Sequence, residues 1–497
     1  MALEFKKAVI ISCGQVEIVR PPAGPAVLAG ICKVNNLDYE FIDLNIFIVN
    51  TVGLDEWSSL YHFTSVYPIS DDFTLSKMHG ILDRFVDQLA TYEADLILIS
   101  VLSYWQNSWC EELLKKIKEK NLSVTTIVGG GGISIPVEEN KTFGKHLIDQ
   151  DLVDYYVLGE GEVVLDKFFK GEFTLGLNSA NNKFESWAIQ IDDLNQIPFP
   201  SYKKIDSRPY VVHEHAGEIS ITGSRGCVRR CTFCDVGAIW KKFRFRSAEN
   251  IAREIEQHYR DTKQTKFFFT DSLVNGSLKT FIQLMEEIIK LQEIHPELKN
   301  IRYSGQFIIR PASQHPEYMY DLMKRSGFGY VIIGVESGSN QVRYHMGKKF
   351  DSVDVDYHME MCSKYQISNL LLLMVGYPTE TLKDFYETID MVKRYQKYRI
   401  DGTLFDVNES QPLIVLKNTP LYDMADDLGI DLSKQYSTYL WKSKLNPDLT
   451  VKERFRRYIE FQRLLVDLDF PRPTQIINEI NEYLNKIEQL VDDNNVR

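Results

Sequence analysis

Long apolar runs, a second CxxC motif and internal repeats are missing from this sequence. No run approaches the roughly 20 apolar residues that a membrane-spanning helix needs, and the apolar stretch near the N-terminus, "AVIIS", is too short for a signal peptide. Seven cysteines in 497 residues are too few for a disulfide-rich secreted protein. We therefore expect a cytoplasmic protein without a membrane partner.

Basic residues are outnumbered by acidic ones. The chain has 57 basic and 69 acidic residues, a net charge of -12, which disfavours a broad nucleic-acid surface. A hydrophobic fraction of 44% and a charged fraction of 25% are typical of a globular protein. The length predicts two or three units, each with its own core.

The first 170 residues alternate short β-branched runs with amphipathic stretches, which predicts a doubly wound, flavodoxin-like or Rossmann-like parallel sheet. The expected strands are "KAVIIS", "YEFIDL", "ADLILIS", "VTTIVGG" and "YYVLGE". Ligands of such sheets bind at the carboxyl ends of the strands. Those ends carry Asp43, Ser100, the glycines 129 to 132, and Gly159.

The rest of the chain predicts three further regions. Residues 171–215 have little periodicity and are expected to form a linker. Six β-then-α units over residues 216–430 predict a partial (βα)6 barrel of the TIM type, so the fold class is α/β. Residues 431–497, with "VKERFRRYIEFQRLL" and "IINEINEYLNKIEQLV", predict a helical C-terminal region.

Three of the seven cysteines lie in the loop "GSRGCVRRCTFCDVGAIW", at Cys227, Cys231 and Cys234. A structural zinc would need a fourth ligand, and only His213 and His215 lie close in sequence. A chance cluster of buried thiols is another alternative. Three thiolates can instead hold three irons of a 4Fe-4S cluster, which leaves the fourth iron open to a substrate.

This CxxxCxxC loop resembles that of the radical S-adenosylmethionine (SAM) superfamily, and "LMVGYPTET" and "NTPLYDMA" extend the resemblance, with Asn418 in place of a glycine. The resemblance implies that SAM binds the open iron and is cleaved to a 5'-deoxyadenosyl radical, which abstracts hydrogen from a small-molecule substrate. It also implies an electron donor such as flavodoxin or ferredoxin. The residues that it assigns to SAM are Phe233, Asp271, Ser272, Ser304, Arg310, Glu336 and Ser337.

Several of these residues also have purely structural interpretations. Asp271 could cap the helix that begins near residue 277. Glu336 could be a salt-bridged carboxylate at a strand end, in a motif that Lys348 closes. Arg310 could be a surface arginine.

The first 170 residues resemble the cobalamin-binding domain often fused ahead of such a barrel. The resemblance assigns Ser100, Gly129, Gly130, Gly131 and Gly159 to cobalamin, with its nucleotide tail between the first and fourth strands. The DxHxxG motif that supplies a histidine to cobalt is absent, because "LNIFI" follows the aspartate of the second strand. Cobalamin is therefore expected to bind without a histidine ligand, and a sheet with tight turns and no cofactor is the alternative.

Together these patterns predict a radical SAM enzyme that methylates an unactivated carbon or phosphorus centre with the help of cobalamin. Ring formation or rearrangement is an alternative on the same scaffold. A methylthiotransferase would need a second cluster, for which Cys13, Cys32 and Cys110 are the candidates, although Cys32 falls in a predicted helix. A zinc-binding or cobalamin-binding regulatory protein without turnover is the alternative from another class.

Overall fold

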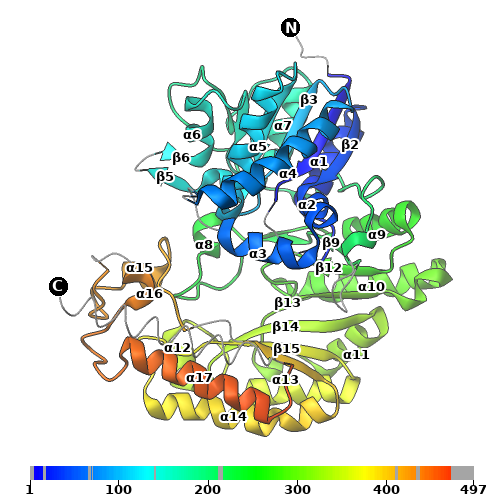
Figure 1. Cartoon of the computed structure of the whole chain (residues 1–497). Coiled ribbons are helices and arrows are strands. Elements are labelled where there is room, and N and C mark those ends of the chain that lie inside the picture. The colour runs from blue at the N-terminus through cyan, green and yellow to red at the C-terminus, as the bar shows by residue number, and fades with distance from the viewer. Residues whose placement is uncertain are drawn as a thin grey trace. The chain divides into compact units, whose positions relative to one another are not determined.

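The computed structural model describes residues 5–14, 18–64, 69, 71–138, 141–210, 217–408, 412–432 and 437–471 (Figure 1). Its contacts divide the chain into two units, Met1–Ile221 with Arg253–Lys266, and Thr222–Ala252 with Phe267–Arg497. Each unit contains parallel β-structure with helices, so the predicted mixed α/β class is confirmed. In these ranges, no helix is both long and apolar enough to cross a membrane.

A six-stranded sheet with the order β2-β1-β3-β4-β7-β8 forms the centre of the first unit. The order reverses between β1 and β3, which makes their carboxyl ends the switch point where doubly wound sheets bind ligands. In this sheet β1, β2, β3, β4 and β7 are parallel, and β8 is antiparallel to β7. The strands are β1 (Lys7–Ser12), β2 (Asp38–Asp43), β3 (Leu96–Ser100), β4 (Thr125–Gly129), β7 (Tyr155–Val157) and β8 (Leu177–Asn178).

Both faces of this sheet are buried, because successive side chains of a strand point to opposite sides. In β1, Val9 and Ile11 belong to one core cluster, and Ala8 and Ile10 belong to another. The helices of the unit are α1 (Ala23–Val34), α2 (Leu44–Val52), α3 (Leu54–Thr64), α4 (Asp72–Ala90), α5 (Asn107–Glu119), α6 (Phe143–Asp149) and α7 (Gly161–Phe169). The short strands β5 (Pro136–Glu138) and β6 (Lys141–Thr142) pair with each other.

Residues 177–210, which the sequence assigns to a linker, pack within the first unit instead. The Ser201 amide donates to the Ala26 carbonyl at 2.8 Å. A Cβ atom at Gly30 would lie 2.3 Å from the Phe199 carbonyl oxygen, so glycine on α1 permits this close approach. Weak periodicity therefore reflects an irregular segment that folds onto a helix, which a sequence pattern does not reveal.

A second six-stranded sheet has the order β16-β15-β14-β13-β12-β9. Figure 1 shows β12 to β15 side by side. In β14, Val331, Ile333 and Val335 are fully buried, whereas Ile332 and Gly334 are half-exposed. One sheet face is thus packed and the other is partly open. The strands are β9 (Ile219–Ile221), β12 (Lys266–Phe269), β13 (Arg302–Phe307), β14 (Phe328–Glu336), β15 (Ser368–Leu373) and β16 (Leu404–Asn408).

Helices α9 (Ala248–Thr262), α10 (Leu278–Ile294), α11 (Glu317–Ser326), α12 (Asn340–His345), α13 (Ser352–Tyr365) and α14 (Leu382–Ile400) alternate with these strands. The C-terminal region has α15 (Pro420–Asp423), α16 (Ser437–Leu440) and α17 (Val451–Asp467). The helix predicted from "VKERFRRYIEFQRLL" is therefore present as α17. The second predicted helix of the tail, at 476–491, lies outside the described residues.

Candidate functional site

The three predicted cluster cysteines lie on one loop whose ends are tied together. Strands β10 (Ser224–Arg225) and β11 (Arg244–Phe245) pair at the base of this loop. The guanidinium carbons of Arg225 and Arg244 lie 5.6 and 5.4 Å from the Trp240 ring centroid, so a cation–π stack reinforces the base. We call residues 226–243 the cysteine loop; it includes the short helix α8 (Val236–Ile239).

The thiols of Cys227, Cys231 and Cys234 are half-buried and form no disulfide. Burial raises the pKa of each thiol. The positive charge of Lys348 offsets part of this rise at Cys227 and Cys231, whose pKa values are still raised. Within the described ranges, no three His, Cys, Asp or Glu side chains are arranged to hold one metal ion. His213 and His215 lie outside those ranges. Soft thiolates spread along one loop fit an iron–sulfur cluster, in which different irons take different ligands.

Glu336 and Lys348 form an ion pair beside this loop. The Lys348 Nζ atom donates to Glu336 Oε1 and to the Gly334 carbonyl, both at 2.9 Å, and lies 5.5 Å from the Phe233 ring centroid. Burial opposes the lysine charge, but Glu336 and the neighbouring thiolates outweigh it and raise the pKa of Lys348. Glu336 is therefore a salt-bridged carboxylate at a strand end, and its role at SAM stays a prediction.

The backbone at the end of β14 is unusual. Glu336 has a φ of 69°, in the left-handed region that costs a non-glycine residue about 1–3 kcal/mol. A Cβ atom at Gly334 would lie 2.3 Å from Glu336 Oε1, so the absent side chain makes room for the carboxylate. Such strain persists where the surrounding structure fixes it, commonly at functional sites.

Asp271 braces the start of the cysteine loop. Its carboxylate accepts hydrogen bonds from the Gly223 amide at 2.7 Å and from the Ser224 hydroxyl at 2.8 Å. The alternative that Asp271 caps the helix near residue 277 is wrong, because the Ser277 side chain caps α10. Ser272, its predicted partner at SAM, is half-buried.

Replacement of Asp271 by asparagine should change how stability depends on pH. Burial raises the pKa of Asp271 from 3.8 to about 7. Because the folded value is the higher one, the contribution of Asp271 to stability is complete below pH 3.8 and is lost as the pH rises to about 7.

Urea unfolding at pH steps from about 5 to about 8 measures this effect. The free energy of unfolding of the wild type, relative to that of Asp271→Asn, should fall by about 1.4 kcal/mol per pH unit up to about pH 7 and then level off. Parallel curves for the two proteins would contradict the prediction.

The side chains of Ser304, Arg310 and Ser337 differ in their hydrogen bonds. The buried hydroxyl of Ser304 has no hydrogen-bond partner among the described residues. Arg310 is half-buried and donates from Nη2 to the Asn275 and Gly276 carbonyls at 3.2 and 2.8 Å, so the alternative of a surface arginine is wrong. The Ser337 hydroxyl lies 3.3 Å from that of Thr388 on α14, inside the protein.

At the carboxyl ends of β4 and β7, the predicted glycines have different surroundings. A Cβ atom would lie 2.3 Å from the Val101 carbonyl oxygen at Gly130 and 2.6 Å from that of Leu102 at Gly131, so these two glycines permit a tight turn. Gly159 also needs a glycine conformation, with a φ of 87°. Gly129 is open, because its nearest contact would be Val157 Cβ at 3.6 Å.

Ser100 and Asp43 lie at other strand ends of this sheet. The strand order puts β3, which ends at Ser100, between β1 and β4, so a nucleotide tail between the first and fourth strands would cross the end of β3. The Asp43 side chain caps α2 by accepting from the Asn45 amide at 2.8 Å, and it accepts from the Tyr210 hydroxyl at 2.6 Å. Ser100 is half-buried at the end of β3, beside Gly24 of α1.

The candidate cysteines for a second cluster do not come together. Cys13 and Cys110 belong to the core cluster on one face of the first sheet, and Cys32 belongs to the cluster on the other face. All three side chains are completely buried. The structure therefore contradicts a second cluster on these three thiols.

The hydroxyl groups of Thr232 and Tyr377 meet at the cysteine loop, and neither was predicted from the sequence. Thr232, between two cluster cysteines, has its Oγ1 atom 2.8 Å from the Tyr377 hydroxyl. Tyr377 lies within "LMVGYPTET", and its hydroxyl donates to the His345 carbonyl at 3.0 Å. No local signal could have paired positions 145 residues apart.

Residues 221–392 match the model of the Radical SAM superfamily. This segment is a radical SAM domain, and the chain is an enzyme of that class. A tRNA-2-methylthio-N(6)-dimethylallyladenosine synthase of Rickettsia typhi is 27% identical over 260 residues, which cover 47% of this chain. The match spans 54% of that relative's length.

Two solved structures share the fold over most of the chain. One is the radical S-adenosylmethionine methyltransferase TsrM from Kitasatospora setae, with cobalamin and a 4Fe-4S cluster bound; its TM-score is 0.60 at 17% identity, over 87% of this chain and 77% of TsrM. The other is the cobalamin-dependent S-adenosylmethionine radical enzyme OxsB, with aqua-cobalamin bound; its TM-score is 0.65 at 15% identity, over 98% of this chain and 72% of OxsB. At these identities the likeness concerns the fold.

Proposed function

We propose that this enzyme cleaves SAM at a 4Fe-4S cluster on Cys227, Cys231 and Cys234, and uses cobalamin in the first unit to methylate an unactivated centre of a small molecule. The observation that carries the proposal is the set of three half-buried thiols on one loop, beside the Glu336–Lys348 pair. When bound, the cluster would supply the electron that cleaves SAM, and cobalamin would carry the methyl group. A flavodoxin or ferredoxin would deliver that electron. The proposal includes a partial (βα)6 barrel as the fold that carries the cluster.

In this proposal the chain's own side chains orient SAM. Lys348 fixes the Glu336 side chain through a 2.9 Å hydrogen bond, and the carboxylate oxygens accept hydrogen bonds from the nucleoside. The buried Ser304 hydroxyl lacks a partner among the described residues, which supports a role in hydrogen bonding to a ligand. Phe233 offers a flat apolar surface beside the last cysteine.

Replacement of Glu336 by alanine should weaken SAM binding while the cluster still assembles. Loss of a charged hydrogen bond corresponds to about 1.5–3 kcal/mol of binding free energy. Anaerobic calorimetric titration with SAM measures the dissociation constant, and iron content measures the cluster. Glu317→Ala is the matched control, because Glu317 pairs with Lys364 at the exposed surface. Equal affinities of Glu336→Ala and wild type would show that Glu336 is only structural.

The cobalamin part of the proposal rests on the switch point and on Gly129. Doubly wound sheets bind flat cofactors where the strand order reverses. Cobalt is expected to lack a histidine ligand, because the aspartate at the end of β2 caps a helix and "LNIFI" follows it. Electron paramagnetic resonance (EPR) of the cob(II)alamin form tests this point, since a nitrogen ligand splits the cobalt lines.

Replacement of Gly129 by leucine should abolish cobalamin retention without unfolding the first unit. Gly129 tolerates a Cβ atom, whereas Gly130 has a φ of 108° and would clash with the backbone. Gel filtration with cobalamin, followed by visible absorbance of the protein peak, gives the measurement. Gly80→Leu is the control, because Gly80 is exposed on α4 and an added Cβ would meet nothing within 4 Å. Full retention by Gly129→Leu would refute this location of cobalamin.

Two measurements separate the proposal from its rivals. A single cluster corresponds to about four irons per chain, and a methylthiotransferase with two clusters to about eight. Incubation of the reconstituted protein with reductant and SAM should release 5'-deoxyadenosine. A protein that binds its cofactors and releases none would be a binding module, and the proposed function would be wrong.

A further inference from the structure

The hydroxyl of Tyr377 connects two segments of the proposed SAM site. Tyr377 is 1% exposed and follows β15 in the connection to α14. Its hydroxyl donates to the His345 carbonyl at 3.0 Å and lies 2.8 Å from Thr232 Oγ1. A phenol has one proton to donate, and the His345 carbonyl accepts that hydrogen bond. The Thr232 hydroxyl must therefore donate to the Tyr377 oxygen.

Thr232 is held by its backbone as well. Its amide donates to the Met346 carbonyl at 3.0 Å, and its carbonyl accepts from the Leu421 amide at 2.7 Å. A Cβ atom at Gly347, where φ is 79°, would lie 3.1 Å from the Arg230 carbonyl oxygen. The cysteine loop and the segment 345–347 are therefore in close contact over several residues.

This contact determines where the proposed cluster lies relative to the ion pair. Lys348 comes directly after the segment 345–347 and donates to Glu336 at 2.9 Å. A shift of the cysteine loop along that segment would change the distance from the thiols to the carboxylate. Reaction rates are sensitive to such shifts, since a misplacement of about 1 Å can cost about 100-fold.

We propose that Tyr377 and Thr232 are positioning residues, whose hydrogen bonds hold the cysteine loop at a fixed distance from the Glu336–Lys348 pair. This inference rests on the proposed function and extends it to two residues that do not themselves contact SAM. The Tyr377–Thr232 hydrogen bond is the part of the contact that a single side-chain change removes.

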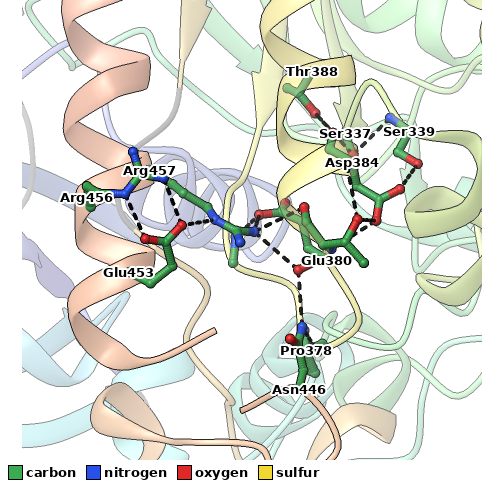
Figure 2. Close-up of polar contacts among 12 residues, drawn as sticks. Ser337, Ser339, Pro378, Glu380, Asp384, Thr388, Asn446, Glu453, Arg456 and Arg457 are labelled. Atoms are coloured by element: carbon green, nitrogen blue, oxygen red, sulfur yellow. Dashed lines mark hydrogen bonds and ion pairs between the residues drawn. The ribbon is translucent and has the colours of Figure 1, made fainter. Parts of the chain in front are cut away.

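Helix α17 supports the connection that carries Tyr377 (Figure 2). Arg457 Nη1 donates to Glu380 Oε1 at 2.8 Å, and the same oxygen accepts from the Gly376 amide at 3.1 Å. Asn446 Nδ2 donates to the Pro378 carbonyl at 3.0 Å. Polar groups on either side of Tyr377 are thus fixed by the C-terminal region, which thereby contributes to the geometry of the site.

The test compares Tyr377→Phe and Thr232→Val with the wild type. Both variants should retain iron, but their SAM dissociation constants should rise about tenfold, as for loss of a buried hydrogen bond. The change that SAM causes in the EPR spectrum of the reduced cluster should also shrink. Thr232→Ser keeps the hydroxyl and should restore wild-type values. Tyr386→Phe is the control, because Tyr386 is an exposed tyrosine on α14.

A second measurement does not depend on the cluster. In cluster-free protein, amide hydrogen exchange of residues 227–234 should be faster in Tyr377→Phe than in the wild type and unchanged in Tyr386→Phe. Equal exchange rates in all three proteins, or wild-type SAM affinity in Tyr377→Phe and Thr232→Val, would overturn the positioning role. A wild type that exchanges as expected but neither holds a cluster nor cleaves SAM would instead overturn the proposed function.

Discussion

Each of the variants Cys227→Ala, Cys231→Ala and Cys234→Ala is expected to purify without iron and to release no 5'-deoxyadenosine. Each thiolate would hold a different iron, so the loss of one leaves an iron without its protein ligand. The half-buried CxxxCxxC loop has only these three thiols, so no other cysteine of the loop can replace the one that is lost. Iron and sulfide assays after anaerobic reconstitution, with chromatography of the SAM cleavage products, give the measurement.

Cys32→Ala provides the control for these variants. Cys32 is a buried core residue of α1, and burial raises the pKa of its thiol to about 12, so it does not supply a thiolate. This variant should retain the iron of the wild type. Full iron content in any of the three loop variants, or loss of iron in Cys32→Ala, would refute the assignment of the cluster to Cys227, Cys231 and Cys234.

Replacement of Arg457 by methionine should reduce the free energy of unfolding by about 3–5 kcal/mol. Arg457 and Glu380 are 3% and 1% exposed, and their ion pair is 2.8 Å long. Burial raises the pKa of Glu380 to about 7 although Arg457 lowers it, so the carboxylate depends on the guanidinium for its charge. Without Arg457, a buried acid is left with fewer partners. Chemical denaturation of the full chain, monitored by tryptophan fluorescence, measures the effect.

The neighbouring Arg456 is the matched control. Figure 2 shows both arginines on α17 with Glu453. Arg456 is 46% exposed and pairs with Glu453 at 2.7 Å, so Arg456→Met should change stability by no more than about 0.5 kcal/mol. The double variant Arg457→Met with Glu380→Met should recover much of the loss, because apolar residues often replace a buried ion pair at little cost. Similar losses for Arg457→Met and Arg456→Met would contradict the prediction.

Sequence patterns located the strands because their information is local. The alternating side chains of "KAVIIS" identify β1, and the run "GYVIIGVES" identifies β14. Helix α2 has no such local signal, since "LNIFIVNTV" is rich in β-branched residues and lacks a polar face. Asn418, which replaces a glycine of the family pattern, adopts a φ of 65°, and asparagine is one of the few other residues that tolerate this conformation.

The sequence by itself determined the class of chemistry, because the spacing of Cys227, Cys231 and Cys234 within eight residues is a property of one short loop. Only the tertiary structure decided what holds that loop. Asp271 bonds Gly223 and Ser224 across 47 or more positions, and Tyr377 reaches Thr232 across 145. The physical reason is that a hydroxyl or carboxyl group finds its partner through the packing of strands and helices, and no sequence period records a contact between residues so far apart.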